Sequence, residues 1–449
     1  MIKTAMSSSF VSRIILINFK ASFKGLDYAE TIQGPIIHID RSFVKRHCDV
    51  TYISMDILKM FKREEKKKSV YMDYASATPV LPEVFSAMVP YFSRSFSNPA
   101  SLYESGVKAK EAILESKHTI AKILGCSSSE IIFTANGTEA NNLAFFGLVN
   151  SDGRFDGKHF VTMKTEHSSI KEIVNEIKKR GGEVSFADVK EDGSIDIKSL
   201  SSAIKENTVM VSVMMVNNEI GTIQPIKEIS SVVRKARKKF GTNIIFHTDA
   251  CQAPQYLPLD IEKLGISMLT LDASKIYGPK GIGLLFVKKG IKLYPIIFGG
   301  GQEYGLRSGT ESVPQIIGFS KALSIVTEDR ETESERIIKI KNYAISEIKK
   351  EFPNSRLNGS IENRIANNVN FCFPGNDSEF LVIKLGYMGI ECAYASSCKT
   401  LGNDNASYVI TSIGNADCAS SSLRFTFGRF TKKEDIDFLI ECLKKIIKK

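Results

Sequence analysis

The sequence lacks several features that would place it in a specialised class of protein. It has no apolar run that approaches the length of a transmembrane helix, so a membrane-spanning protein is not expected. Its eight cysteines include no CxxC pair and no zinc-ligand spacing, which argues for reduced, intracellular thiols rather than a disulfide framework. It has no internal repeat and no low-complexity segment. The composition is that of a soluble globular protein, and 449 residues are enough for two or three domains.

Positive charge is concentrated at the start of the chain. The net charge is +10, and residues 1–69, with 13 Lys/Arg against 7 Asp/Glu, carry +6 of it. No acidic residue precedes Asp27, a composition that fits a mitochondrial presequence as well as an extension of unknown role. The remainder is only mildly basic, so direct contact with nucleic acid is not expected. We expect a cytoplasmic protein, or one of the mitochondrial matrix if residues 1–69 hold a presequence.

From Val70 onward, segments typical of strands alternate with segments typical of helices. Strands are predicted at 130–134, 159–163, 209–216, 243–247 and 282–287. Helices are predicted at 105–124, from 141, at 168–180 and at 226–240. This alternation predicts an α/β fold with a mostly parallel sheet.

The pattern changes after Thr310. Helices are predicted at 313–326, 330–352 and 432–448, with short strands at 366–373 and 422–427. We therefore expect a second, smaller α+β domain. The predicted parts are an N-terminal extension (1–69, ending in a charged linker), a large domain (70–325, its first residues joining the small domain) and a small C-terminal domain (326–449).

One lysine lies where a lysine is rarely placed. Lys275 follows an apolar strand pattern, precedes the turn-forming Gly278-Pro279 and is followed by another buried-strand pattern. A lysine held out of water between two strands suits Schiff-base chemistry. The alternative is an ordinary turn whose lysine extends to solvent, and this segment alone does not decide between them.

Polar residues also follow the other predicted strands. They are Gly137, Thr138, His167, Asn218, Asp249 and Gln252. Each one taken singly has a structural explanation, as a helix cap, a turn or a hydrogen-bonded loop residue. In open α/β sheets, however, ligands bind at the carboxyl ends of the strands. Four kinds of group lie at those ends: a helix N-terminus that can bind an anion, an imidazole, a carboxylate and a lysine. Together they favour a pyridoxal phosphate (PLP) site.

The residues from about Tyr71 to Thr431 resemble the cysteine desulfurases of the NifS/IscS branch. The matching segments are Tyr71–Pro79, Ser97–Ser101, Ile132–Glu139, Thr165–His167, Val216–Pro225, His247–Gln252, Ser274–Gly281, Gly299–Glu303, Arg307–Thr310 and Ser422–Phe425. This family belongs to the class-V group of the PLP-dependent aspartate-aminotransferase superfold. The resemblance implies a large PLP-binding domain with a mostly parallel seven-stranded sheet, a smaller α+β C-terminal domain and a homodimer.

The resemblance also implies roles for individual residues around the cofactor. Lys275 would be the catalytic Schiff-base lysine, and Asp249 would hold a proton on the pyridine nitrogen. Gln252 would contact the ring hydroxyl, and the catalytic His167 would stack on the ring. The remaining implied contacts are Gly137, Thr138, Ser274 and Asn218 on the cofactor, Thr310 on the partner subunit's phosphate, and Asn218 and Arg424 on the substrate carboxylate.

A cysteine distinguishes this reaction from transamination. Cys398 lies in the small-residue stretch 395–400, at the place of the family's catalytic cysteine, and Lys399 favours its thiolate. Cys392 is a nearby competitor, whereas Cys126, Cys372 and Cys442 have apolar surroundings that suggest structural roles.

Several positions depart from the family pattern. Ser274 replaces a histidine, Tyr103 stands where histidine is common, and the chain lacks the longer C-terminal tail of IscS-type members. Asp272 replaces a serine that contacts the phosphate, and a carboxylate within about 4 Å of a phosphate is repelled by about 1 to 4 kcal/mol.

The resemblance predicts a PLP-dependent L-cysteine desulfurase that yields L-alanine and a persulfide on Cys398. The sulfur would pass to an acceptor protein that serves iron–sulfur cluster assembly or tRNA thiolation. Two alternatives stay open: another class-V lyase or aminotransferase, such as a selenocysteine lyase, and a non-catalytic member that has lost PLP.

Overall fold

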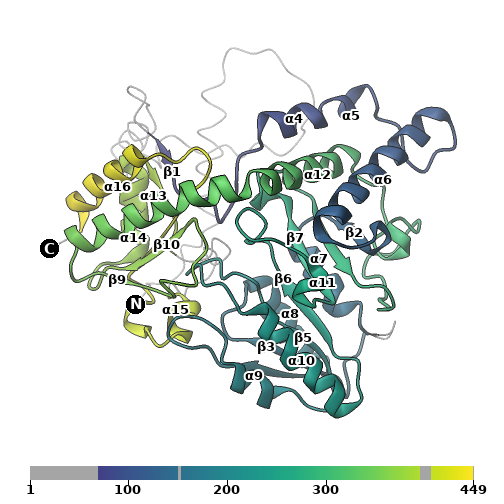
Figure 1. Ribbon diagram of the computed structural model, residues 1–449, viewed down its shortest axis with the longest axis horizontal. Coiled ribbons are helices and arrows are strands. Elements are labelled where there is room, and N and C mark those ends of the chain that lie inside the picture. The colour runs from purple at the N-terminus through teal and green to yellow at the C-terminus, as the bar shows by residue number, and fades with distance from the viewer. Residues whose placement is uncertain (1–68, 150–152, 395–405, 448–449) are drawn as a thin grey trace, which may run out of the picture. The chain divides into compact units, whose positions relative to one another are not determined.

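Short buried apolar segments form a mixed seven-stranded sheet (Figure 1). The computed structural model describes residues 69–149, 153–394 and 406–447, all within one compact unit, Lys67–Lys449. The strands lie side by side in the order β2 (Ile131–Thr134), β8 (Gly283–Val287), β7 (Met268–Asp272), β6 (Ile245–Asp249), β5 (Thr208–Ser212), β3 (His159–Met163) and β4 (Glu183–Ala187). Every neighbouring pair is parallel except the two that involve β8. The mostly parallel seven-stranded sheet predicted from the sequence is confirmed.

Helices cover both faces of this sheet. They are α4 (Pro82–Met88), α5 (Pro90–Ser93), α6 (Glu104–Leu124), α7 (Gly137–Phe146), α8 (Ser168–Lys179), α9 (Ile197–Ala203), α10 (Ile226–Phe240), α11 (Ile261–Leu264) and α12 (Val313–Glu328). Leu284 and Phe286 of β8 belong to one apolar core with residues of α6, α10 and α12, while Leu285 and Val287 belong to another with residues of α7 and α8. Strands buried on both faces read as continuous apolar runs, which is why they could be predicted.

A smaller group of elements follows α12. These are α13 (Arg330–Glu351), α14 (Ser378–Met388), α15 (Tyr408–Ser412) and α16 (Lys433–Ile446), with strands β9 (Arg356–Leu357), β10 (Asn368–Cys372) and β12 (Ser422–Thr426). The three strands form an antiparallel sheet in the order β12, β10, β9. Near the start of the described chain, β1 (Val70–Tyr71) pairs in parallel with β11 (Ile390–Glu391). This pairing brings the beginning of the described chain against its C-terminal part, while the predicted division into domains stays a prediction.

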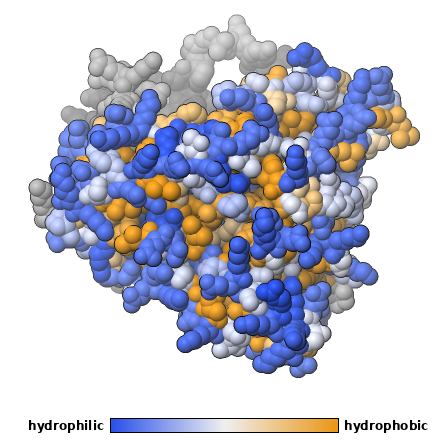
Figure 2. Space-filling model, viewed as in Figure 1, coloured by the Kyte–Doolittle hydropathy of each residue, from blue (hydrophilic) through white to orange (hydrophobic). Residues whose placement is uncertain are grey.

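The surface is mainly polar on the face shown in Figure 2, where hydrophobic residues appear in patches between hydrophilic ones. No helix within the described ranges is long and apolar enough to cross a membrane. The predicted extension is outside this description, since residues 1–68 are not among the described residues.

Two of the predicted element boundaries that differ from the structure lie beside the cavity described below. Helix α7 begins at Gly137 rather than near Asn141, because the side chain of Asn136 accepts a hydrogen bond from the Glu139 N–H (2.9 Å) and caps the helix. Strand β5 ends at Ser212 rather than Val216. The chain beyond it still runs beside β6, because Met215 N donates to the Asp249 carbonyl (2.8 Å).

The expectation of reduced thiols is wrong for one pair of cysteines. Cys372 on β10 and Cys418 form a disulfide, and both residues are fully buried. They are 46 residues apart, so only the antiparallel pairing of β10 with β12 brings them together. The spacing of cysteines along the sequence gave no sign of this pair.

His247 in β6 is buried without an acidic partner in hydrogen-bonding contact. Its Nδ1 lies 2.9 Å from Ser212 Oγ and its Nε2 lies 3.1 Å from Thr270 Oγ1. Burial lowers its pKa from 6.5 to about 4. Between these two values the unfolded chain binds a proton that the folded chain does not bind. Stability contributed by the neutral imidazole is therefore present above pH 6.5 and is lost as the pH falls toward 4.

We predict that the free energy of unfolding of the wild type falls between pH 6.5 and pH 4 by up to about 3 kcal/mol more than that of the His247→Asn variant. Chemical denaturation at a series of pH values measures it. His118→Asn, a change at an exposed histidine of α6, is the matched control and should leave the pH dependence unaltered. A His247→Asn variant with the same pH dependence as the wild type would show that burial does not govern this histidine.

Candidate active site

One cavity gathers most of the residues that the sequence predicted for a site. Its volume is about 210 Å³. Eight predicted residues line it: Gly137, Thr138, His167, Asn218, Asp249, Gln252, Lys275 and Arg424. They come from the ends of β2, β3, β5, β6 and β7, and from β12. The carboxyl ends of the parallel strands and one strand of the smaller sheet thus meet at this cavity.

Lys275 lies in the short 3₁₀ turn η2 (Ala273–Lys275) that follows β7. Its ammonium nitrogen donates a hydrogen bond to the carbonyl oxygen of Ser76, and its own carbonyl accepts one from Gln255. The side chain is partly buried and lines the cavity. The sequence interpretation of a lysine held between two strands rather than in solvent is consistent with this position.

Asp249 ends β6, and its carboxylate is held from two sides. Asn141 Nδ2 donates to Oδ2 (2.8 Å), and the backbone N–H of Cys251 donates to Oδ1 (3.0 Å). Only 9% of the residue is exposed. Hydrogen bonds to a carboxylate fix its orientation, so Asp249 presents a positioned acceptor to whatever occupies the cavity.

His167 is connected to Asp249 through α7 and α8. It caps α8, and its Nδ1 accepts a hydrogen bond from the Ser169 N–H (3.2 Å). Ser169 Oγ in turn accepts from Asn141 Nδ2 (3.0 Å), the same amide group that holds Asp249. Because Nδ1 is an acceptor, the neutral ring carries its proton on Nε2.

A second carboxylate lies under the cavity. Glu166 is fully buried, and its Oε1 accepts a hydrogen bond from Met214 N (2.7 Å). Burial, and next the nearby charge of Asp249, raise its pKa well above the ordinary value. Burial thus favours the protonated form of Glu166 more than water does.

Arg424 joins the smaller sheet to the cavity. Its Nη1 donates to the Asn218 carbonyl (2.9 Å), and its Nη2 donates to Asp73 Oδ1 (2.6 Å) and Ser76 Oγ (2.8 Å). The residue is 1% exposed, and its Nε has no hydrogen-bond partner among the described residues. Arg424 lines the cavity, so its guanidinium suits the cavity to an anionic ligand.

Asp272 lies at the N-terminus of α7. Its Oδ2 accepts a hydrogen bond from Gly137 N (2.9 Å), and its Oδ1 accepts from Ser274 N (2.9 Å) and Ser274 Oγ (2.6 Å). Gly137 and Thr138 do line the cavity as predicted, but Ser274 bonds Asp272 and is not among the lining residues.

Three further predictions have different outcomes. Gln252 lines the cavity but donates to the carbonyl of Ala75 (2.9 Å). Thr310 is exposed and is not among the residues that line the cavity, so its contact with a partner subunit stays a prediction. Cys398 lies outside the described residues.

The cysteines described near the cavity are poor nucleophiles. Burial raises the pKa of Cys392, and burial, followed by the charge of Asp249, raises that of Cys251. Both are therefore neutral thiols near pH 7, and the thiolate is the reactive form. This weighs against Cys392 as the sulfur acceptor.

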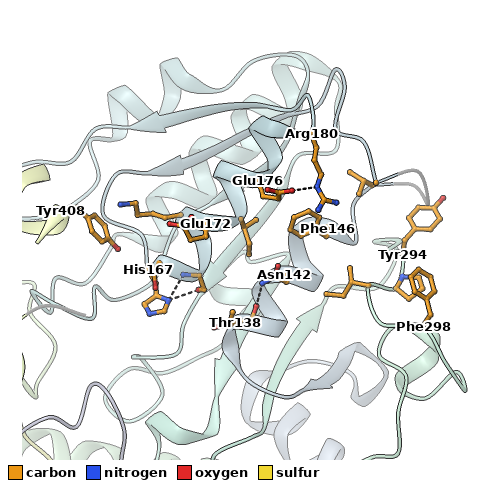
Figure 3. Close-up of a pocket in the computed structure, with 18 residues that line it drawn as sticks. Thr138, Asn142, Phe146, His167, Glu172, Glu176, Arg180, Tyr294, Phe298 and Tyr408 are labelled. Atoms are coloured by element: carbon orange, nitrogen blue, oxygen red, sulfur yellow. Dashed lines mark hydrogen bonds and ion pairs between the residues drawn. The ribbon is translucent and has the colours of Figure 1, made fainter. Parts of the chain in front are cut away.

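A larger cavity of about 920 Å³ adjoins the first and shares Thr138, His167 and Ser169 with it (Figure 3). Figure 3 shows Tyr294 and Phe298 together at one end and His167 with Tyr408 at the other. The smaller cavity therefore opens toward a broader space bordered by aromatic side chains.

Sequence reasoning missed Asn141, Ser169 and Glu166. Asn141 was the most accessible to prediction, because it is a polar residue on the otherwise apolar face of α7, with Ala140, Leu143 and Ala144. Glu166 stands in the matched segment Thr165–His167, but nothing in the sequence indicated its burial.

Comparison with known proteins agrees with this geometry. The family model "Aminotransferase class-V" matches residues 70–439. The chain is 38% identical over 384 residues to "Cysteine desulfurase IscS" of Dictyoglomus turgidum, covering 85% of this chain and 95% of that protein. A solved "NIFS-LIKE PROTEIN" aligns with a TM-score of 0.78 at 27% identity, covering 84% and 99% of the two chains. "SspA in complex with cysteine" aligns with a TM-score of 0.70 at 32% identity, covering 81% and 99%.

We predict that Asn141→Leu lowers the free energy of unfolding by about 2 to 4 kcal/mol, because it leaves Asp249 Oδ2 buried without its donor. Equilibrium denaturation measures the loss. Asn142→Leu changes the partly exposed neighbour, whose side chain donates to the Thr138 carbonyl, and should cost well under 1 kcal/mol. Equal losses in the two variants would contradict the role given to Asn141.

Proposed function

The chain belongs to the class-V aminotransferase family, and we propose that it is a PLP-dependent L-cysteine desulfurase. It converts L-cysteine to L-alanine and retains the sulfur on a cysteine of its own. The observation that carries this proposal is the common cavity of Lys275, Asp249 and Arg424. Those three side chains supply an amine, a carboxylate and an anion-binding guanidinium, which are the groups that an amino-acid substrate and a pyridine cofactor require.

The residues of the cavity fit the cofactor of this family. Asp249 is a buried carboxylate with both oxygens already positioned, as a partner of a protonated ring nitrogen must be. His167 and Gln252 lie beside it, and Gly137 and Thr138 form the helix start where a phosphate can bind. When bound, PLP would supply an electron-withdrawing ring that makes the Cα hydrogen of the substrate acidic and stabilises the electron pair left on the carbon side when the bond to sulfur breaks.

The substrate carboxylate is bound by Arg424 and Asn218. Arg424 is held by Asp73, Ser76 and the Asn218 carbonyl, so its guanidinium has a fixed orientation beside the cavity. A guanidinium and a carboxylate match in geometry, and a pre-positioned guanidinium loses little entropy on binding.

Lys275 is the base of the reaction. Its Nζ is close enough to the Ser76 carbonyl to donate a hydrogen bond, which steadies the amine in the cavity. Lys275 Nζ removes the Cα proton and later returns it, as a general base and acid. One residue, Lys275, therefore serves as both the base and the acid in this proton transfer.

Cys398 accepts the sulfur. Its thiolate attacks the sulfur of the substrate, so that a bond between the two sulfurs forms while the bond from the substrate sulfur to Cβ breaks. The electron pair of the broken bond stays on the carbon side, which takes up a proton and leaves as L-alanine. Cys398 keeps the sulfur as a persulfide, and the sum of substrate and thiol equals the sum of alanine and persulfide.

The protein works as a homodimer and passes its sulfur to an acceptor protein. Exposed aromatic side chains beside the larger cavity support a partner subunit there: Phe298 is 80% and Tyr294 is 47% exposed. The acceptor serves iron–sulfur cluster assembly or tRNA thiolation. The cytoplasmic location predicted from the sequence stays a prediction.

We predict that Cys398→Ser abolishes the formation of protein-bound persulfide from L-cysteine and lowers alanine release at least 100-fold, while PLP binding is unchanged. Labelled cysteine, followed by mass spectrometry of the protein, measures the persulfide. Cys392→Ser is the matched control and should retain full activity. Desulfuration that persists in Cys398→Ser would contradict this assignment and would favour a lyase such as a selenocysteine lyase.

We predict that Arg424→Lys raises the KM for L-cysteine about 10- to 100-fold, because an ammonium cannot match the carboxylate as a guanidinium does. Steady-state kinetics measure KM and kcat separately. The same change should leave the dissociation constant of PLP within about threefold. An unchanged KM would remove Arg424 from the substrate site.

A further inference from the structure

The N-terminus of α7 already has an anion that the chain itself provides. The carboxylate of Asp272 accepts one hydrogen bond from Gly137 N and two from Ser274. A helix N-terminus of this kind favours negative charge and is a common binding site for phosphate. Asp272 therefore uses the Gly137 N–H, a donor that a bound phosphate would otherwise receive.

The space around these donors is narrow. A Cβ atom on Gly137 would come within 2.9 Å of Cys251 Sγ and 3.6 Å of Asp272 Oδ2. Cys251 and Asp272 thus border Gly137 closely, and both line the cavity. A phosphate that reached the Gly137 N–H would lie close to the Asp272 carboxylate.

The other charged side chains of the cavity do not neutralise this carboxylate. Among the described residues that line it, Asp249, Asp272, Lys275 and Arg424 have charged side chains. Arg424 is already paired with Asp73 (2.6 Å), and Lys275 is the amine that reacts. His167 contributes a ring whose Nδ1 accepts a hydrogen bond and is therefore unprotonated.

We propose that Asp272 selects against the phosphate of the cofactor: it competes for the Gly137 donor, so the chain binds PLP more weakly than it would with a neutral residue at 272. This inference rests on the proposed function, because it takes PLP as the ligand. The selection acts on the phosphate and not on the ring, since Asp249 and Lys275 hold the ring end. Pyridoxal, which has the same ring without the phosphate, is therefore not disfavoured by Asp272.

The test compares the dissociation constants of PLP and pyridoxal by equilibrium dialysis of the full chain. Asp272→Ser removes the carboxylate, and Asp272→Asn removes the charge while it keeps the shape and an acceptor oxygen. Both changes should tighten PLP binding about fivefold or more, and leave pyridoxal binding within about twofold. For each variant, the result is the ratio of the PLP dissociation constant to the pyridoxal dissociation constant. A change in the fold that affects both ligands equally cancels in this ratio.

Asp196→Asn is the matched control. Asp196 also caps a helix, with its carboxylate on the N–H groups of Lys198 and Ser199, but it does not line the cavity. It should leave both dissociation constants unchanged. If Asp272→Ser fails to fold, as circular dichroism would show, Asp272→Asn alone decides.

The outcomes separate this inference from the proposed function. A wild type that binds PLP as tightly as both Asp272 variants overturns the inference and leaves the function intact. Equal gains for PLP and pyridoxal also overturn it, because the effect would not lie at the phosphate. Failure of the wild type and of both variants to bind PLP overturns the inference and the function together. A selective gain for PLP supports it, including the case in which only the variants bind PLP.

Discussion

The ion pair between Arg424 and Asp73 is the interaction on which the site depends. Arg424 lies on β12 of the smaller sheet, and its guanidinium reaches Asp73, Ser76 and the carbonyl of Asn218. It is almost completely buried, so loss of either partner would leave an uncompensated charge inside the protein. Ser76 also accepts the hydrogen bond from Lys275. Segments that are hundreds of residues apart thus converge at one point, and the cavity is the space that they enclose.

Three further groups of the cavity lie at the ends of secondary-structure elements. Asp249 is the last residue of β6, Lys275 follows β7 by one short turn, and His167 caps α8. Asn141 of α7 connects two of them, since its amide contacts both Asp249 and Ser169. Rigid elements fix reacting groups more precisely than loops do. Hydrogen bonds from Gly137 and Ser274 likewise hold the carboxylate of Asp272 in one position beside the cavity.

Much of the fold could be predicted because its strands are buried on both faces and its helices are amphipathic. The positions of Lys275 and Asp249 followed from the rule that ligands bind at the carboxyl ends of parallel strands. The bond between Asp272 and Gly137 could not be predicted, because it joins residues 135 positions apart through the pairing of β7, β8 and β2. The disulfide of Cys372 and Cys418 and the raised pKa of Glu166 likewise result from three-dimensional packing. The role of Cys398 rests on the family resemblance, since it lies outside the described residues.

We propose that Lys275 is the residue to which the cofactor attaches. Incubation of the protein with PLP, reduction with borohydride, digestion and mass spectrometry would locate the attached pyridoxyl group. The account predicts that it is on Lys275, and that Lys280, five positions further along and exposed, remains unmodified. Attachment spread over exposed lysines, or none at all, would contradict it.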